Sequence, residues 1–303
     1  MEYVTRRLIA VVPVWAGVSL IVFALLRIAP GGPFDQEREL PPEVKANLLH
    51  QYGLDKPLWE QYWIYVFNAA RADFGVSFRY KELTVRQIIA ERFLPSLELG
   101  STAMVIVLLI GIPLGIVAAV QQRSWVDYLG MAVTLTCYAT PPFVIALVFI
   151  LLFAVTLHLL PVSGWGGLSH FVLPATVLGI GPGAVIARLT RGGMLEVLRQ
   201  DYTRTARAKG LQERAVVLQH VLKNALIPVI TTLGLQASYL ITGSIVIEYI
   251  FSVPGMGQLF VTSLTNRDYP LVMGVALFYA TVILVANLVV DLCYSILDPR
   301  VRY

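Results

Sequence analysis

The chain has 303 residues, a mean hydropathy of +0.71 and 57% hydrophobic residues, whereas only 14% of its residues are charged. Soluble domains carry about 25% charged residues, so this composition excludes an ordinary soluble protein. The net charge of +4 does not indicate nucleic-acid binding, because the cations gather in segments that flank uncharged runs. Those runs are continuous rather than alternating, which predicts an all-α polytopic membrane protein and argues against a β-barrel.

The apolar runs predict six membrane-spanning helices, each of which needs about 20 residues to cross a bilayer. In chain order they cover residues 8–28, 99–120, 129–157, 171–187, 225–247 and 270–293. Prolines 141 and 142 are expected to kink the third span. The fourth span is the weakest, because it is short and four residues interrupt it: Gly179, Gly181, Pro182 and Gly183.

The spans divide the chain into a first helix at residues 1–29, a connecting segment at 30–97 and a five-helix part at 98–303. The connecting segment contains many aromatic residues and prolines, which predicts a small cap of short helices rather than a disordered linker. The aromatic residues are Tyr52, Trp59, Tyr62, Trp63, Tyr65, Phe67, Phe74 and Phe78.

The short loops predict the orientation of the chain in the membrane. The loop at 188–224 holds eight cations, whereas the loop at 157–171 has no Lys or Arg. Cytoplasmic loops carry an excess of Lys and Arg, so we expect this basic loop and both termini to be cytoplasmic and the cap to be extracytoplasmic. The eight cations are Arg188, Arg191, Arg199, Arg204, Arg207, Lys209, Arg214 and Lys223.

Motifs for enzyme chemistry are missing from the sequence. It has no G-x-x-x-x-G-K-[ST] phosphate loop, and its four histidines are scattered without metal-ligand spacing. Cys137 and Cys293 both lie in apolar spans, which makes a disulfide framework or a zinc site improbable. The GIGPG segment at 179–183 indicates a closely packed or flexible helix rather than a nucleotide site. We therefore expect neither an enzyme active site nor a cofactor site in this chain.

Polar residues within the spans are the candidates for a translocation path. No span has a charged residue at its centre, which argues against a carrier driven by its own ion gradient. Candidate lining residues are Tyr138, Thr140, Gln236, Ser238, Tyr239 and Thr242. Each of these side chains can equally serve as an interhelical hydrogen-bonding group. Glu248, near an outer span end, is a candidate for binding a substrate amine at an outer gate, and a structural pair is the alternative.

The segment DYTRTARAKGL at 201–211 lies in the basic loop. Asp201 or Thr203 is expected to cap a short helix that Gly210 ends, and a second, amphipathic helix is expected to restart at Leu211. The small residues Ala206, Ala208 and Gly210 would let such a helix seat in a groove of a partner protein that supplies energy. The alternative is a basic loop lying on anionic lipid headgroups.

The stretch RTARAKG at 204–210, followed by LKNALIPV, resembles the cytoplasmic loop of binding-protein-dependent ABC importer permeases. In that family a Glu-Ala-Ala triplet, three residues and then a glycine mark the coupling helix that docks on the ATPase subunit. Here the triplet is Arg204-Thr205-Ala206, and Gly210 stands at the expected spacing. The resemblance implies ATPase-coupling roles for seven residues: Arg204, Thr205, Ala206, Arg207, Lys209, Gly210 and Leu211.

The resemblance extends over nearly the whole chain. Motifs include RIAPGGPFD at 27–35, LPPEVKANL at 40–48, YGLDKPL at 52–58, DFGVSF at 73–78, GSIVIEYIFSVPGMGQLF at 243–260, NRDYPLV at 266–272 and DPRVRY at 298–303. In order, they resemble the B-type permease subunits of oligopeptide importers. This implies the type I ABC importer fold, with six transmembrane helices, in the bacterial cytoplasmic (inner) membrane.

The same resemblance implies a set of partners. They are a homologous C-type permease subunit, two ABC ATPase subunits that bind ATP and Mg, an extracytoplasmic peptide-binding protein and a peptide substrate. Permeases for dipeptides, glutathione or nickel chelates are alternatives within the family. A self-contained secondary carrier or channel, or a membrane anchor for a cytoplasmic complex, would be a different class of protein.

Overall fold

The computed structural model describes residues 2–34, 41–80 and 82–297, and these residues are almost entirely helical. Their only β-type pairing is an isolated bridge between Val76 and Thr84. The all-α prediction is therefore confirmed. The longer helices are α1 (Glu2–Ile28), α4 (Val85–Val120), α5 (Trp125–Ala139), α7 (Leu168–Val197), α11 (Ile227–Ile241) and α14 (Tyr269–Leu297). The shorter ones are α2 (Pro42–Gln51), α3 (Leu58–Ala69), α6 (Pro142–Phe149), α8 (Asp201–Ala208), α9 (Glu213–Ala215), α10 (Leu222–Ala225), α12 (Ile245–Ile250) and α13 (Met256–Thr265), with π-helical segments η1 (Ile150–Thr156) and η2 (Val216–Val221).

Four helices, α1, α4, α7 and α14, are long and apolar enough to cross a membrane. Two bent pairs pass the same test together, so the described residues supply up to six spans if each pair counts as one. The first pair joins α5 to α6 and η1 with a bend of 109°, and the second joins 213–225 to α11 with a bend of 54°. The predicted runs therefore correspond to these elements, although several of the predicted bounds differ from the structure.

The second predicted span starts too late. Helix α4 begins at Val85 rather than at residue 99, because its first turns are also apolar on one side. Ile88 and Ile89 pack there with Leu271 and Val275 in a buried cluster. A hydropathy window misses these turns, because the charged residues 86, 91 and 92 alternate with the buried ones.

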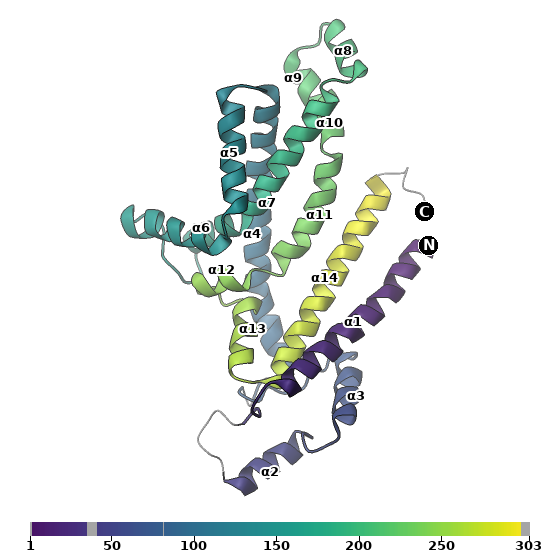
Figure 1. The fold of residues 1–303 in the computed structure, drawn as a ribbon, viewed down its shortest axis with the longest axis vertical. Coiled ribbons are helices and arrows are strands. Elements are labelled where there is room, and N and C mark those ends of the chain that lie inside the picture. Colours follow the sequence, from purple (N-terminus) through teal and green to yellow (C-terminus); the bar gives the residue numbers. More distant parts are fainter. Residues whose placement is uncertain (1, 35–40, 81, 298–303) are drawn as a thin grey trace. The chain divides into compact units, whose positions relative to one another are not determined.

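The third predicted span is broken rather than merely kinked. Helix α5 ends at Ala139, because its C-cap residue Thr140 has an extended backbone and Pro141 has no N–H group with which to continue the helical hydrogen bonds. Helix α6 then turns across the end of α5 (Figure 1).

The fourth predicted span is the reverse case, because α7 is one continuous helix of 30 residues despite its glycines and prolines. A Cβ atom on Gly179 would lie 2.9 Å from the backbone oxygen of Ala103 in α4. The glycine therefore permits close contact of two helices. The predicted shortness and interruption of this span were wrong, although it is the least hydropathic of the four single-helix candidates, as expected of the weakest span. The expectation that GIGPG is closely packed is confirmed at Gly179.

The fifth predicted span ends too late. Helix α11 stops at Ile241, and Gly243 adopts a positive φ of 73°. The Ser244 side chain then accepts a hydrogen bond from the backbone N–H of Ile247 and so caps α12. The apolar run through residue 247 is thus two helices with a turn between them.

The described residues form two compact units, and α4 and α14 contribute to both. One unit comprises residues 97–253 with the end of α14. Its core lies between α4, α6, α7, α11 and α12 and includes Leu99, Val107, Ile145, Leu178 and Leu240. In Figure 1, α8 and α9 lie at the opposite end of this unit from α6 and α12.

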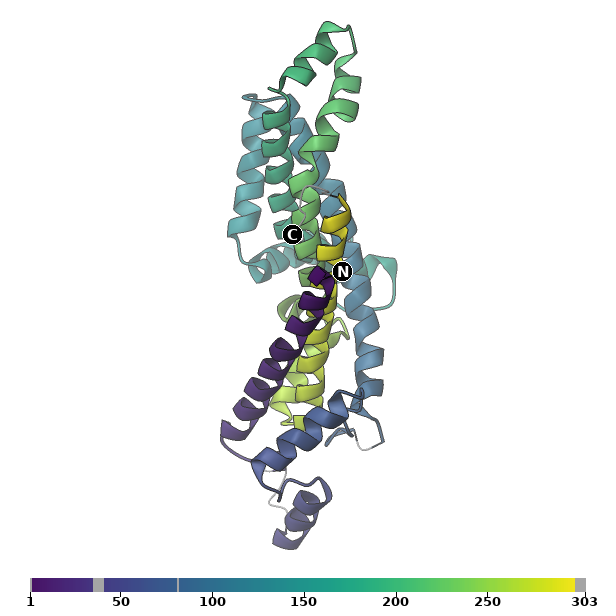
Figure 2. The same cartoon turned by 90° about the vertical axis from the view of Figure 1, so that its right-hand side faces the viewer.

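The other unit comprises residues 2–96 and 254–288 and includes the predicted cap. Its helix α3 packs beside α1 (Figure 2), where the hydroxyls of Tyr62 and Ser19 lie 2.9 Å apart. The Asp268 carboxylate accepts hydrogen bonds from the Ser77 hydroxyl and from the backbone N–H of Phe78. These contacts tie the segment between α3 and α4 to the start of α14.

Candidate functional site

Helix α8 rests on the end of α7 through two buried residues. The Thr203 hydroxyl donates a hydrogen bond of 2.9 Å to the backbone oxygen of Val197, the last residue of α7. Ala206, one turn later, packs in a cluster with Met194, Val216 and Val221. The 201–208 segment is thus fixed to α7 and η2 by its own buried side.

The N-cap of α8 differs from the prediction. Gln200 occupies the N-cap position and makes no side-chain cap hydrogen bond, so neither Asp201 nor Thr203 caps the helix. Thr203 instead bonds to α7, and Asp201 lies in the first turn. The second helix begins at Glu213 after an extended residue, Gln212, rather than at Leu211.

The remaining predicted coupling residues face outward. Exposed side chains belong to Arg204, Thr205, Arg207, Lys209 and Leu211. Ala206 is the exception, because it is buried against the chain's own core. The structure therefore places Ala206 where it holds the helix, and leaves the others available to a partner.

Gly210 ends α8 in a left-handed backbone conformation with φ of 80°. Its N–H donates to the backbone oxygen of Arg207, and a Cβ atom built on it would meet nothing within 4 Å. Glycine is therefore favoured by the backbone conformation and not by crowding within the chain.

The turn at Gly210 is bridged by Arg207 and Glu213. The guanidinium donates two hydrogen bonds, of 2.9 and 2.6 Å, to the carboxylate of Glu213. The hydrogen bonds to this carboxylate raise the pKa of Arg207 above its ordinary value. Because both side chains are exposed, the pair adds at most about 1 kcal/mol to stability, but it fixes the position of α9 relative to α8.

An ion pair with a buried carboxylate and a partly exposed guanidinium joins α7 to α5, and the sequence prediction missed it. The Arg191 guanidinium donates bonds of 2.6 and 2.8 Å to the Asp127 carboxylate, which also accepts the backbone N–H of Arg123 at 3.0 Å. The Asp127 side chain is only 3% exposed. Asp127 fell just before the predicted third span, so it read as a loop residue. The sequence signal that could have indicated the pair is a carboxylate just before an apolar run in a chain whose loops carry a surplus of cations.

A cavity of about 240 Å³ lies between α5, α6, α7 and α11. Four predicted path residues line it together: Tyr138, Thr140, Gln236 and Tyr239. The rest of the lining is largely aliphatic, with Gly181 and Pro182 of α7 among it. Arg188 lies over the face of Tyr138, with its Cζ atom 4.6 Å from the ring centroid.

Three other predicted path residues do not line this cavity. Ser238 is buried, and the Thr242 hydroxyl donates to backbone oxygens of its own helix at 2.9 and 3.1 Å. Glu248 is fully buried. Its burial favours the structural alternative over direct contact with a substrate, because a buried carboxylate needs compensating partners.

The described residues contain no group of three or more His, Cys, Asp or Glu that could hold a metal ion. The cavity and α8 are connected through α7, because α7 contributes Pro182 and Val185 to the cavity and its last residue, Val197, accepts the hydrogen bond from Thr203 of α8. This connection offers a route by which a movement of α8 could reach the cavity.

Comparisons with known proteins agree on one family. The family model described as "Binding-protein-dependent transport system inner membrane component" matches residues 111–303. The dipeptide transport system permease protein DppB of Bacillus subtilis is 42% identical, over 99% of this chain and 98% of its own length. The oligopeptide transport system permease proteins OppB of Haemophilus influenzae and Escherichia coli are 42% and 41% identical, each with full coverage of both chains.

Solved structures show the same fold at low sequence identity. A chain of the inward-facing MetNI methionine ABC transporter aligns with a TM-score of 0.60 and 15% identity, covering 70% of this chain and 97% of that chain. A chain of an amino acid ABC transporter aligns with a TM-score of 0.52 and 17% identity, covering 69% of this chain and 94% of that chain.

Proposed function

This chain belongs to the family of binding-protein-dependent transport system inner membrane components, and we propose that it is the pore-forming permease of an oligopeptide importer. The family assignment confirms the resemblance seen in the sequence. It makes the chain a multi-pass permease of an ABC importer, without catalytic activity and without a cofactor of its own.

Full-length similarity to peptide permeases is the observation that carries the cargo proposal. The identities to oligopeptide and dipeptide permeases are nearly equal, so the motifs APGGPF and LPPEV support the choice of longer peptides. The cavity supports a peptide path, because hydroxyl and amide groups among aliphatic side chains offer weak contacts to many sequences.

We place the basic loop and both termini in the cytoplasm and the 30–97 cap outside, because the loops follow the positive-inside rule. A homologous C-type permease would complete the pore, and two ATPase subunits would bind ATP and Mg. An extracytoplasmic binding protein would deliver the peptide and supply most of the selectivity.

The coupling mechanism follows from the contacts of α8. Closure of the ATPase pair on ATP would push α8, and the bond from Thr203 to Val197 would pass that movement to α7. The Arg191–Asp127 pair would make α5 move with α7. Because α5 and α7 both line the cavity, its shape would then change with the state of the ATPases.

Peptide cargo predicts a specific dependence of ATP hydrolysis on peptide length. The complete complex would be reconstituted in liposomes with its binding protein, and ATPase activity and uptake would be measured with peptides of two to eight residues. We expect stimulation that is greatest for peptides longer than two residues. Strongest stimulation by dipeptides would assign the dipeptide alternative, whereas no response to any peptide would overturn peptide transport.

Gly210 offers a test of the coupling role that is free of crowding within the chain. Gly210→Trp should reduce peptide uptake at least tenfold while ATP hydrolysis loses its response to peptide, because an added Cβ meets no atom within 4 Å and the ring would project where the ATPase is proposed to dock. The positive φ adds backbone strain, which Gly210→Asn and the control at Gly166 allow for. Gly210→Asn should keep most activity, because asparagine tolerates the left-handed conformation.

Gly166 is a matched control for this substitution. It is exposed, has a positive φ of 131° and likewise has nothing within 4 Å of an added Cβ. Gly166→Trp should leave the coupling of hydrolysis to uptake unchanged, since we place its loop on the opposite side of the membrane. Normal coupling in the Gly210→Trp complex would contradict docking at α8.

A further inference from the structure

Arg188 of α7 is a cation without an acidic partner. Among the described residues, its guanidinium forms neither an ion pair nor a hydrogen bond, and it lies over the face of Tyr138 with 4.6 Å between the Cζ atom and the ring centroid. Arg191, three residues later, is instead bound by the Asp127 carboxylate. A ring attracts a cation less strongly than a carboxylate does, and a guanidinium stacked on a ring keeps its N–H edge free. Arg188 can therefore still bind an anion.

The helical register of α7 places Arg188 at the cavity of about 240 Å³ in the same unit. Gly181 and Val185 line this cavity, and Arg188 follows Val185 by three residues. Residues spaced by three and four lie on one face of a helix, and three steps cover about 4.5 Å along its axis. Tyr138, whose ring the guanidinium covers, is itself a lining residue. Arg188 therefore lies at the end of the cavity nearer α8.

The cavity has polar groups but no charge of its own. Its described lining residues include no Asp, Glu, Lys or Arg, and they offer the hydroxyls of Tyr138 and Tyr239 and the amide of Gln236. Charges act strongly where water is scarce, so one unbalanced cation at the end of such a cavity sets the sign of its potential. We therefore expect the cavity to attract a carboxylate and to repel an ammonium group.

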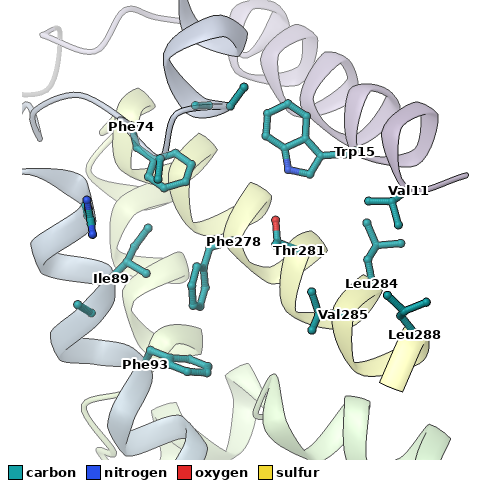
Figure 3. Close-up of a pocket in the computed structure, with 15 residues that line it drawn as sticks. Val11, Trp15, Phe74, Ile89, Phe93, Phe278, Thr281, Leu284, Val285 and Leu288 are labelled. Atoms are coloured by element: carbon teal, nitrogen blue, oxygen red, sulfur yellow. The ribbon is translucent and has the colours of Figure 1, made fainter. Parts of the chain in front are cut away.

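A larger cavity, of about 750 Å³, lies between α1 and α14 in the other unit and lacks these features. Figure 3 shows its lining, with Trp15 of α1 and Phe278 of α14 among the labelled residues. The lining is apolar except for Thr281 and Arg86, and the Thr281 hydroxyl already donates to the backbone oxygen of Leu277 at 2.8 Å. A peptide backbone placed there would lose its hydrogen bonds to water without replacement, so we assign no peptide to it.

We propose that Arg188 binds the C-terminal carboxylate of the transported peptide, and that the ring of Tyr138 holds the guanidinium in place for it. Every linear peptide with a free C-terminus carries this group, so such recognition does not restrict the peptide sequence. Arg188 is then a binding residue of the translocation path and Tyr138 a positioning residue. The inference rests on the proposed transport of peptides and adds a direction, because the carboxylate of the cargo points toward the end of the cavity nearer α8.

Arg188→Gln, combined with blocked peptide termini, tests this contact. Uptake into liposomes by the complete complex is measured with tetraalanine, its C-terminal amide and its N-acetyl form, each delivered by the same binding protein. Arg188→Gln should lower uptake of tetraalanine and of the N-acetyl form about tenfold, because a charged hydrogen bond is lost. Uptake of the amide should change little, which also shows that the variant complex is assembled. Comparing each peptide between the two complexes cancels the binding protein's own preference for a terminus.

Further substitutions separate a cation at the cavity from a cation elsewhere in the basic loop. Arg199→Gln removes an exposed cation that does not line the cavity, and should leave the ratio of tetraalanine uptake to amide uptake unchanged. Tyr138→Leu should reduce that ratio, because the guanidinium loses the ring that positions it. Tyr138→Phe should preserve it, because phenylalanine keeps an aromatic face.

Cys137 gives a measurement that needs no binding protein. It lines the cavity beside Tyr138, so a peptide in the cavity should slow the reaction of its thiol with a maleimide. The complete complex is placed in nanodiscs, with its other cysteines replaced by serine. Tetraalanine should slow the labelling severalfold, its C-terminal amide should not, and Arg188→Gln should abolish the protection.

The outcomes distinguish this inference from the proposed function. Equal or absent protection by tetraalanine and its amide, or an equal loss of uptake of both in Arg188→Gln, would overturn the binding of a carboxylate by Arg188 and leave peptide transport in place. An unchanged uptake ratio in Tyr138→Leu would overturn the positioning role of Tyr138. Absence of uptake of every peptide by the unaltered complex would instead contradict the proposed function itself.

Discussion

Replacing Asp127 with alanine should reduce peptide uptake at least tenfold and lower the melting temperature of the complex. The substitution leaves Arg191 without the carboxylate that binds it through two bonds of 2.6 and 2.8 Å, and it leaves the N–H of Arg123 without its acceptor. Removing one partner of a charged, hydrogen-bonded pair costs about 1–3 kcal/mol, and the value lies toward the lower end here because the Arg191 side chain is 27% exposed and can be solvated. It would also remove the charged link between α5 and α7, which stay packed together, so that less of a movement of α8 would reach the α5 wall of the cavity.

The measurement needs to separate loss of coupling from loss of folding. Asp127→Asn keeps the shape of the side chain and some hydrogen bonds, so the variant should still assemble with the ATPases. Peptide should nevertheless stimulate ATP hydrolysis by the variant complex less than it stimulates the wild-type complex. The exchange Asp127→Arg with Arg191→Asp should recover part of the uptake, and only part, because the exchanged pair cannot accept the N–H of Arg123.

The exposed pair of α8 is the matched control. Arg204 and Asp201 lie 3.7 Å apart with their side chains largely in solvent, so Asp201→Ala should change the melting temperature very little. If Asp127→Ala were as harmless to uptake and stability as Asp201→Ala, the Arg191–Asp127 pair would have no part in coupling.

The sequence predicted the helical class and the number of apolar runs, because both depend on composition and run length. It also located the basic segment that ends at Gly210, because a glycine after a short helix has a local conformational cause. Four of the path candidates meet around one cavity for a similar reason, since polar residues on apolar helices turn toward one another or toward water.

Contacts between distant segments were beyond reach of the sequence. The Arg191–Asp127 pair joins residues 64 positions apart, and nothing in either local pattern names the other. The break after α5 and the continuity of α7 illustrate the same limit. Pro141 prevents α5 from continuing beyond Ala139, whereas α7 accommodates Pro174 and Pro182 because neighbouring helices support it. Local propensity alone does not distinguish these two outcomes.

Gly100→Ala should be the most damaging of the small substitutions in the bundle. A Cβ atom at this position would lie 2.1 Å from the backbone oxygen of Leu240 and 2.7 Å from its carbonyl carbon, and backbone atoms cannot move aside as a side-chain tip can. Helices α4 and α11 would have to separate, at a cost of about 1–3 kcal/mol or more. Because α11 carries Gln236 and Tyr239, the cavity should be distorted as well.

Gly192→Ala is the control that isolates this close approach. Gly192 lies inside α7 with nothing within 4 Å of an added Cβ, so alanine there should stabilise the helix by up to about 1 kcal/mol. Thermal unfolding of the purified complex should therefore show a lower melting temperature for Gly100→Ala and an equal or higher one for Gly192→Ala. Peptide uptake should be lost only in Gly100→Ala. Equal tolerance of both substitutions would mean that α4 and α11 do not meet backbone to backbone at Gly100, and that the position of Tyr239 at the cavity does not depend on that contact.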